Sequence, residues 1–189
     1  MSFAFKEWAL VCDALGEGRQ SIILRKGGIA EGRAGFRWQQ EQFLLLPTLF
    51  HEQVAKLKVP AGTTMPAPRA DGMLEVRYQV CVEWAEEIDD LDSVRRLAPF
   101  HLWQDEVIEE RFRYKDDPRI SLAFVRVQCI SSPFLFPDLP KYGGCRSWVQ
   151  IPDMPESIEV QPVLDDAVHL QRESLIRLAL SAPVAAGER

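Results

Sequence analysis

Cations and glycines cluster in the first part of the sequence, in a pattern typical of phosphate-binding turns. Arg25 and Lys26 follow a short apolar run and directly precede Gly27 and Gly28. A buried strand would therefore carry two positive charges to a glycine turn, whose backbone N–H groups can also bind an anion. The segment is not a P-loop, because Arg33 stands at the position of that motif's lysine. A solvated basic loop with turn glycines remains the alternative interpretation.

Aromatic and basic residues alternate in a second stretch, residues 141–148, which reads KYGGCRSW. Stacking of bases on Tyr142 or Trp148, with Arg146 on a phosphate, would suit single-stranded nucleic acid. The two aromatic residues would serve equally well in a core or a lid. Arg126 lies inside an apolar run, where it is either paired on a solvent face or directed at a ligand. If the fold brings this stretch beside the glycine turn, the two signals become one site.

Several kinds of catalytic and metal chemistry have no signature in the sequence. The four cysteines form no C-x-x-C pair, so we expect reduced cysteines that pack as small hydrophobes, with Cys145 in a glycine turn as the one candidate for a reactive thiol. His51 and Glu52 begin an H-E-x-x-H motif, but Ala55 replaces its second histidine. The G-x-S-x-G elbow does not occur. We therefore assign no catalytic residue, no metal ligand and no cofactor.

Length and charge narrow the class of protein. A chain of 189 residues with 47% hydrophobic residues fits one globular domain, since domains average roughly 150 residues. The net charge of −6 excludes a globally basic nucleic-acid coat, but the first 60 residues hold eight lysines and arginines against six carboxylates. No apolar run approaches the roughly 20 residues of a membrane helix, and no signal peptide is evident. We expect a cytoplasmic protein that does not contact membranes; the sequence carries no sign of its oligomeric state.

Hydrophobic periodicity predicts a mixture of helices and strands. Apolar side chains recur at helical spacing from Phe5 to Leu15, which predicts a helix over residues 3–16 capped by Ser2. Strict alternation over the eleven residues 74–84 predicts a half-buried antiparallel strand. Further strands are expected at residues 20–24, at 43–46 before Pro47, at 120–130 and at 147–151, and further helices at 51–58, 93–97, 100–114 and 165–180.

Loops separate these elements and set the expected domain limits. Residues 59–73 and 131–146 are rich in proline and glycine, and the second stretch would expose Phe134, Leu135 and Phe136. We expect a single α+β domain over residues 1–151 that includes the loop at 59–73. Residues 152–181 would form a connection and a C-terminal helix packed on that domain, and 182–189 a tail. The apolar stripe of this helix is expected at Leu164, Val168, Leu175 and Ala179.

Four separated motifs resemble DUF1802, an uncharacterised prokaryotic family known only as a domain of unknown function. The resemblance covers about residues 3–151 and implies no established activity. Its motifs are Phe5-Lys6-Glu7-Trp8, Leu24-Arg25-Lys26-Gly27-Gly28-Ile29, Pro47-Thr48 with Phe50-His51-Glu52-Gln53, and Tyr142-Gly143-Gly144-Cys145-x-Ser147-Trp148.

A weaker likeness is to the ASCH division of PUA-like β-barrels. Gly18, Ser21 and Arg25 occupy the glycine, threonine and arginine positions of its G-x-K-T-x-E-x-R motif. Gln20 and Ile23 replace the lysine and the glutamate at which the hydrolytic members would transfer protons, so these departures argue against that activity and leave ligand binding open. It implies an α+β fold with a mixed, largely antiparallel β-barrel or curved sheet, flanked by N-terminal, central and C-terminal helices.

The leading functional hypothesis is a non-catalytic module that binds RNA, single-stranded nucleic acid or a nucleotide. Its site would combine the glycine turn with Arg126 and the stretch from Tyr142 to Trp148. One alternative is a metal-dependent nuclease of the PD-(D/E)XK kind, for which Asp71 with Glu75-Val76-Arg77 is the nearest match. A third is a protein-interaction module that docks a partner on Phe134, Leu135 and Phe136.

Overall fold

A mixed β-sheet organises the molecule. The computed structural model describes residues 1–26, 36–114 and 117–182. Among these residues, seven strands form one sheet: β1 (Ser2–Trp8), β2 (Ile22–Arg25), β3 (Gln42–Thr48), β4 (Met73–Ile88), β5 (Ile120–Pro137), β6 (Trp148–Ile151) and β7 (Val160–Pro162). Six of them follow the order β2-β5-β4-β3-β1-β6. The seventh strand, β7, pairs with a later part of β5 than β2 does, along the same edge.

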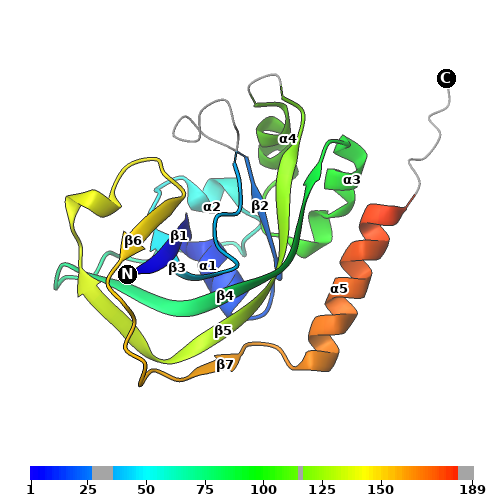
Figure 1. Ribbon diagram of the computed structural model, residues 1–189. Helices are drawn as coiled ribbons and strands as arrows, with labels where there is room; N and C mark the ends of the chain where they lie inside the picture. The colour runs from blue at the N-terminus through cyan, green and yellow to red at the C-terminus, as the bar shows by residue number, and fades with distance from the viewer. Residues whose placement is uncertain (27–35, 115–116, 183–189) are drawn as a thin grey trace, which may run out of the picture.

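The sheet is curved and open. Only β1 and β3 pair in parallel, whereas all other neighbouring strands are antiparallel. Strands β4 and β5 run side by side over their whole length and bend together, and two irregularities in their register increase the local twist (Figure 1). Because β2 and β6 end the hydrogen-bonded order, the sheet does not close. Of the two expected forms, the α+β curved sheet is confirmed and the barrel is not.

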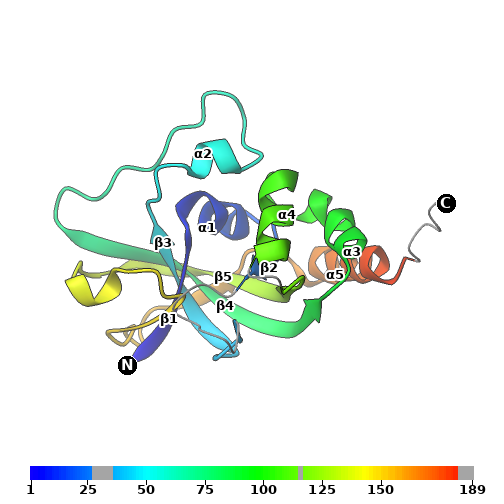
Figure 2. The ribbon, with the colours of Figure 1, turned by 90° about the horizontal axis from the view of Figure 1, so that it is seen from above.

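Helices flank this sheet on one side and at one end. Helices α1, α2 and α4 lie on the same side of the sheet, whereas α3 and α5 lie next to each other at one end (Figure 2). Asp90 caps α3 and Asp165 caps α5 with their carboxylates. The helices are α1 (Ala9–Gly16), α2 (Gln53–Lys56), α3 (Leu91–Arg96), α4 (Asp105–Arg113) and α5 (Asp166–Ser181), with 3-10 turns at Ala98–Phe100 and Pro140–Tyr142. In the described part of the chain, none of them is long and apolar enough to span a membrane.

Strand alternation divides the core into two clusters. On β1, Phe5 belongs to the larger cluster and Ala4 to the smaller one. On β3, Leu45 and Leu44 are divided in the same way. Successive side chains of a strand point to opposite faces, so both faces of this part of the sheet are buried.

The N-terminal segment is a strand followed by a helix, so the predicted helix over residues 3–16 is wrong in its first half. Residues 2–8 form β1, which pairs with both β3 and β6, and α1 begins only at Ala9. The pattern SFAFKEW satisfies strand alternation as well as helical spacing. Hydrogen bonds to two neighbouring strands, together with burial of Phe5, decide between the two periods.

Strand β5 is longer than predicted and includes residues 131–137, the first part of the expected loop at 131–146. Its distal part pairs with the beginning of β4, where Met73 lies opposite Pro137. Phe134 and Phe136 are consequently buried in the smaller core cluster, and only Leu135, at 39% exposure, faces solvent. The expected exposed docking surface at residues 134–136 is therefore wrong.

Two helices differ from their predicted extents or faces. Helix α4 begins at Asp105 rather than at 100, because a β-bridge between Leu57 and Trp103 holds the preceding residues extended. On α5 the predicted stripe is wrong, since Val168 and Leu175 are exposed and the buried residues are His169 and Ile176. The expected tail at 182–189 lies outside the described residues except for residue 182, and the proposed domain limits stay a prediction.

Candidate functional site

A groove of about 550 Å³ opens between the ends of β1, β2, β3 and α4 and the loop before β6. It brings Arg25 and Lys26 together with residues 144–147, so the two stretches that the sequence singled out share one surface. We call it the cationic groove. Its walls combine basic and aromatic side chains, chiefly Lys6, Arg25, Lys26, Arg111 and Arg146 with Trp8, Phe50 and Tyr114.

A buried carboxylate holds Arg25 in the wall of the groove. Glu7 is 1% exposed, and its Oε2 lies 3.4 Å from Nη1 of Arg25. The other terminal nitrogen of Arg25 donates to the Lys6 carbonyl and to Oγ of Ser147, each at 3.3 Å, and the guanidinium lies over the Phe5 ring. Arg25 therefore joins β1 to the loop before β6, and Glu7 neutralises much of its charge.

The two lysines of the groove are held by main-chain carbonyls. Nζ of Lys6 donates to the carbonyls of Tyr142 and Gly144, at 2.9 and 2.6 Å. Burial lowers the pKa of Lys6, and the positive charges of Arg146 and Arg25 lower it further. Lys26 donates to the carbonyls of Asp117 and Arg119. These contacts fix both ammonium groups in the lining of the groove.

Arg111 and Arg146 supply charge to the groove without a direct ion-pair partner among the described residues. Neither forms an ion pair or a hydrogen bond with another residue in the part of the chain that the structure describes. The Arg111 guanidinium stacks over the Trp103 ring, 3.6 Å from its centroid, and also approaches Trp8. Burial lowers the pKa of Arg111 to about 10, so it is protonated at neutral pH. A desolvated cation without hydrogen-bond acceptors is suited to an anionic ligand.

Aromatic faces lie next to these charges. Trp8 and Phe50 pack with ring centroids 5.2 Å apart at the groove, and Tyr114 is largely exposed at its edge. Arg111 and Tyr114 are three residues apart on and just after α4, a spacing that places both on one side of the helix end. The groove thus offers both phosphate contacts and stacking surfaces to one ligand.

Comparison with known protein families identifies the family of this chain. The model of DUF1802, a domain of unknown function, matches residues 4–174. The chain belongs to the DUF1802 family. No functionally curated protein matches the sequence of this DUF1802 member.

Solved structures with a likeness to this DUF1802 chain are ASCH proteins from Zymomonas mobilis. A ZmASCH mutant shares 12% identity over 70% of this chain and 72% of that one, with a TM-score of 0.44. The structure titled ASCH shares 10% identity over 66% of each chain, with a TM-score of 0.40. This is the family of the weaker sequence likeness, and similarity at this level carries no argument about function.

The aromatic residues predicted to stack on bases are core residues in this DUF1802 domain. Tyr142 is 4% exposed and packs edge-on against Phe136. Trp148 packs against the rings of Phe5 and Phe43, with centroids 5.0 Å away in each case. Neither ring lines the cationic groove, although Tyr142 borders a second cavity next to it. Gly27 and Gly28 of the predicted site lie outside the described residues.

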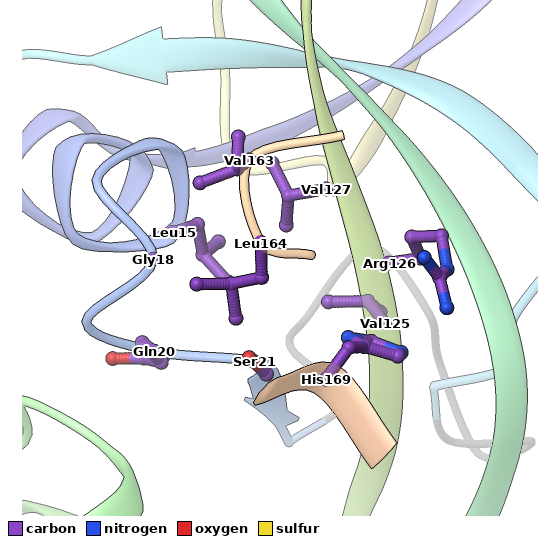
Figure 3. A pocket seen from close by; sticks show the side chains of 10 residues that line it. All are labelled: Leu15, Gly18, Gln20, Ser21, Val125, Arg126, Val127, Val163, Leu164 and His169. Carbon is purple, nitrogen blue, oxygen red and sulfur yellow. The ribbon is translucent and has the colours of Figure 1, made fainter. Parts of the chain in front are cut away.

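Arg126 is paired and lies apart from the groove. It contacts Oε1 of Glu83 at 3.0 Å and Oδ1 of Asp166 at 2.6 Å, and the other oxygen of Glu83 lies 3.0 Å from Nε2 of His169. Arg126 and His169 border a cavity of about 10 Å³ where α5 meets β5, with room for no more than a water molecule (Figure 3). Of the two roles that the sequence left open for Arg126, the structure shows pairing.

The carboxylates of the nuclease alternative are bound by arginines. Asp71 and Glu75 both contact Arg69, at 2.6 and 2.9 Å, and Glu75 also pairs with Arg77. Within residues 1–26, 36–114 and 117–182, no group of three histidine, cysteine, aspartate or glutamate side chains is placed to hold a metal. The match to a PD-(D/E)XK site is thus a surface ion-pair cluster.

Trp8 and Arg111 line the groove but are not among the site residues predicted from the sequence. The predicted helices at 3–16 and 100–114 contain these two residues and assign neither of them to a site. The signal that could have found Trp8 is the alternation of β1, which places Lys6 and Trp8 on one face. Arg111 had no such signal, because its neighbours Trp8 and Trp103 come from distant segments.

Proposed function

We propose that this domain binds single-stranded nucleic acid, with phosphates in the cationic groove and bases against its aromatic rings. The observation that carries the proposal is the pair of arginines without an ion-pair partner among the described residues, Arg111 and Arg146, beside the aromatic side chains of Trp8, Phe50 and Tyr114. Cations that follow a backbone, interleaved with stacking surfaces, are the usual means of binding a single strand. The proposed role is binding, without cleavage of a bond.

The charge distribution supports a local site. The chain as a whole carries −6, so long-range forces repel a polyanion. Attraction must therefore come from contacts inside the groove, where partial desolvation strengthens each charge–charge interaction. Binding should weaken steeply as salt concentration rises, because each phosphate contact releases condensed counterions.

The test compares arginines inside and outside the groove. Fluorescence anisotropy of a labelled oligouridine of about ten nucleotides measures affinity over a range of salt concentrations. The Arg111→Ala and Arg146→Ala variants should each bind more weakly. Each should also reduce the slope of log affinity against log salt by about 0.7, the value for one lost contact to a single strand.

Arg113→Ala is the matched control. Arg113 also lies on α4, but it pairs with Glu109 and does not line the groove. This variant should keep the affinity and the salt slope of the wild type, and thermal unfolding should show that all three variants are folded. Absence of binding by the wild type at low salt, or an equal loss in Arg113→Ala, would refute the proposal.

A further inference from the structure

A second cavity, of about 490 Å³, adjoins the cationic groove. It lies between α1, the end of β3, the loop at 59–72 and the beginning of β4. Lys6, Thr48 and Leu49 line both spaces, so the cavity and the groove meet at these three residues. One ligand can therefore reach from the positive charges of the groove into the cavity.

The walls of this cavity are mainly apolar. Leu45, Pro66, Pro68 and Met73 are among the residues that line it. Its volume lies within the range of about 300–1,000 Å³ that is usual for small-molecule sites. Apolar walls of this kind can pack against the face of a ring whose polar edge is bound elsewhere in the cavity.

Two polar side chains line the cavity without a partner among the described residues. The carboxylate of Asp13 accepts no hydrogen bond and forms no ion pair there, and the hydroxyl of Tyr78 forms no hydrogen bond. Burial raises the pKa of Asp13, and the charge of Glu17 raises it as well, whereas that of Arg77 lowers it. Half-buried polar groups without partners are suited to hydrogen bonds with a ligand.

Gly16 makes room for the ring of Tyr78. A Cβ atom at Gly16 would lie 1.9–2.5 Å from carbon atoms of that ring, so a side chain there would displace the ring. The end of α1 thus seats Tyr78 beside the cavity. Arg77 also lines it; its Nε pairs with Glu75, which leaves its terminal nitrogens available as donors.

We propose that this cavity binds the guanine base of a nucleotide whose phosphate lies in the cationic groove, an inference that rests on the proposed function. A carboxylate such as Asp13 presents two acceptors, and guanine presents two adjacent N–H donors at N1 and N2. Arg77 can donate to O6 and N7, the pairing by which arginine commonly recognises guanine. Adenine, cytosine and uracil each place an acceptor beside their Watson–Crick donor, which a carboxylate repels.

The base preference is tested by calorimetric titration with guanosine, adenosine, cytidine and uridine monophosphates. The guanine nucleotide should bind about tenfold or more tightly than the others, the discrimination expected of a bidentate contact. Inosine monophosphate, which lacks the 2-amino group, should fall between guanine and adenine nucleotides. Equal affinity for all the nucleotides would overturn the assignment, unless the strand experiment below shows a guanine preference.

A second experiment, with oligonucleotides, distinguishes a guanine within an RNA strand from the guanine of a free nucleotide. An oligouridine of about ten nucleotides is compared with the same strand carrying one guanosine. Tighter binding of the guanosine strand, without binding of the mononucleotide, assigns the cavity to a base within RNA. Tight binding of guanosine monophosphate, without a preference between strands, assigns it to a free nucleotide. Absence of both effects overturns the inference.

Asp13→Asn tests the assigned contact, because the amide presents one donor and one acceptor in place of two acceptors. This variant should lose about tenfold in affinity for the guanine ligand and keep its affinity for oligouridine. Glu17→Gln is the control, since Glu17 lies one turn along the chain from Asp13, pairs with Arg19 and does not line the cavity. If the wild type binds oligouridine but shows no preference for guanine, the assignment of the cavity is refuted and the proposed function is not. Loss of all binding in the wild type refutes the proposed function as well.

Discussion

At the scale of single residues, the buried carboxylate of Glu7 reduces the positive charge that Arg25 can offer to a ligand. Glu7 accepts hydrogen bonds from the backbone of Trp8 and from Arg25, so much of the Arg25 charge is used inside the protein. Arg111 and Arg146 have no such partner in the described part of the chain. The positive charge that a ligand would meet therefore comes mostly from these two arginines. Arg25 contributes to the wall of the same groove.

His101 should make stability depend on pH. It is 5% exposed, its Nδ1 accepts a hydrogen bond from the backbone N–H of Trp103, and burial lowers its pKa to about 4 from 6.5. Between these two pH values, His101 is therefore protonated in the unfolded chain and neutral in the folded protein. This contribution to stability is complete above about pH 6.5 and is lost as pH falls toward 4. The free energy of unfolding should drop by about 3 kcal/mol over that window.

Urea unfolding at several pH values measures this effect. The His101→Asn variant is the comparison, because Oδ1 of asparagine can accept the same hydrogen bond and does not titrate. It should lose less stability than the wild type between neutral pH and about pH 4. If both proteins lose the same amount, His101 is not responsible.

At the scale of elements, polar contacts specify how α5 lies on the sheet. Arg126 and Glu83 connect β5 and β4 to Asp166 and His169 of the helix. Nε1 of Trp84 donates to Glu173 one turn further on. Because these contacts are directional, they define the rotation of a helix whose exposed face carries several apolar residues.

Arg126→Ala should therefore affect stability and leave nucleic-acid affinity unchanged. The variant breaks two partly exposed ion pairs, which together contribute about 1 kcal/mol to the free energy of unfolding. Denaturant unfolding and oligouridine anisotropy on the same sample measure the two quantities. A loss of affinity as large as that of Arg111→Ala would instead place Arg126 in the binding site.

At the scale of the whole molecule, the C-terminal segment completes the core. Strand β7 pairs with β5 from Gln128 to Ile130, and Ile176 of α5 is fully buried in the larger core cluster. The ring of Phe124 packs against His169. These contacts join the segment to the strands that precede it.

A fragment ending at Ile151 should be much less stable than the full chain. Without α5, Phe124 and its neighbours would be exposed to water, and the loss of one buried side chain such as Ile176 alone costs about 2–5 kcal/mol. Circular dichroism during heating should show the fragment unfolding at a lower temperature, or without a cooperative transition. A fragment that unfolds at the temperature of the full chain would establish residues 1–151 as an independent domain.

Local sequence patterns predicted secondary structure correctly where the apolar residues fitted a single period, either that of a strand or that of a helix. The alternation over residues 74–84 predicts the centre of β4, and the prolines and glycines at 59–73 predict the loop that the structure contains. The segment at residues 3–8 fits two periods at once, so only its pairing with β3 and β6 could identify it as a strand. The end of β5 likewise depends on its partner β4, because Pro133 and Pro137 by themselves indicate a loop.

The sequence by itself determined the composition of the two basic stretches, the α+β class and the membership of DUF1802. Only the tertiary structure decided which cations lack an ion-pair partner and which aromatic rings line the cationic groove. Tyr142 and Trp148 became core residues, whereas Trp8 and Arg111 came to line the groove. The physical reason is that burial and charge pairing depend on contacts between strands and helices that are far apart in the chain. Local spacing cannot encode such contacts.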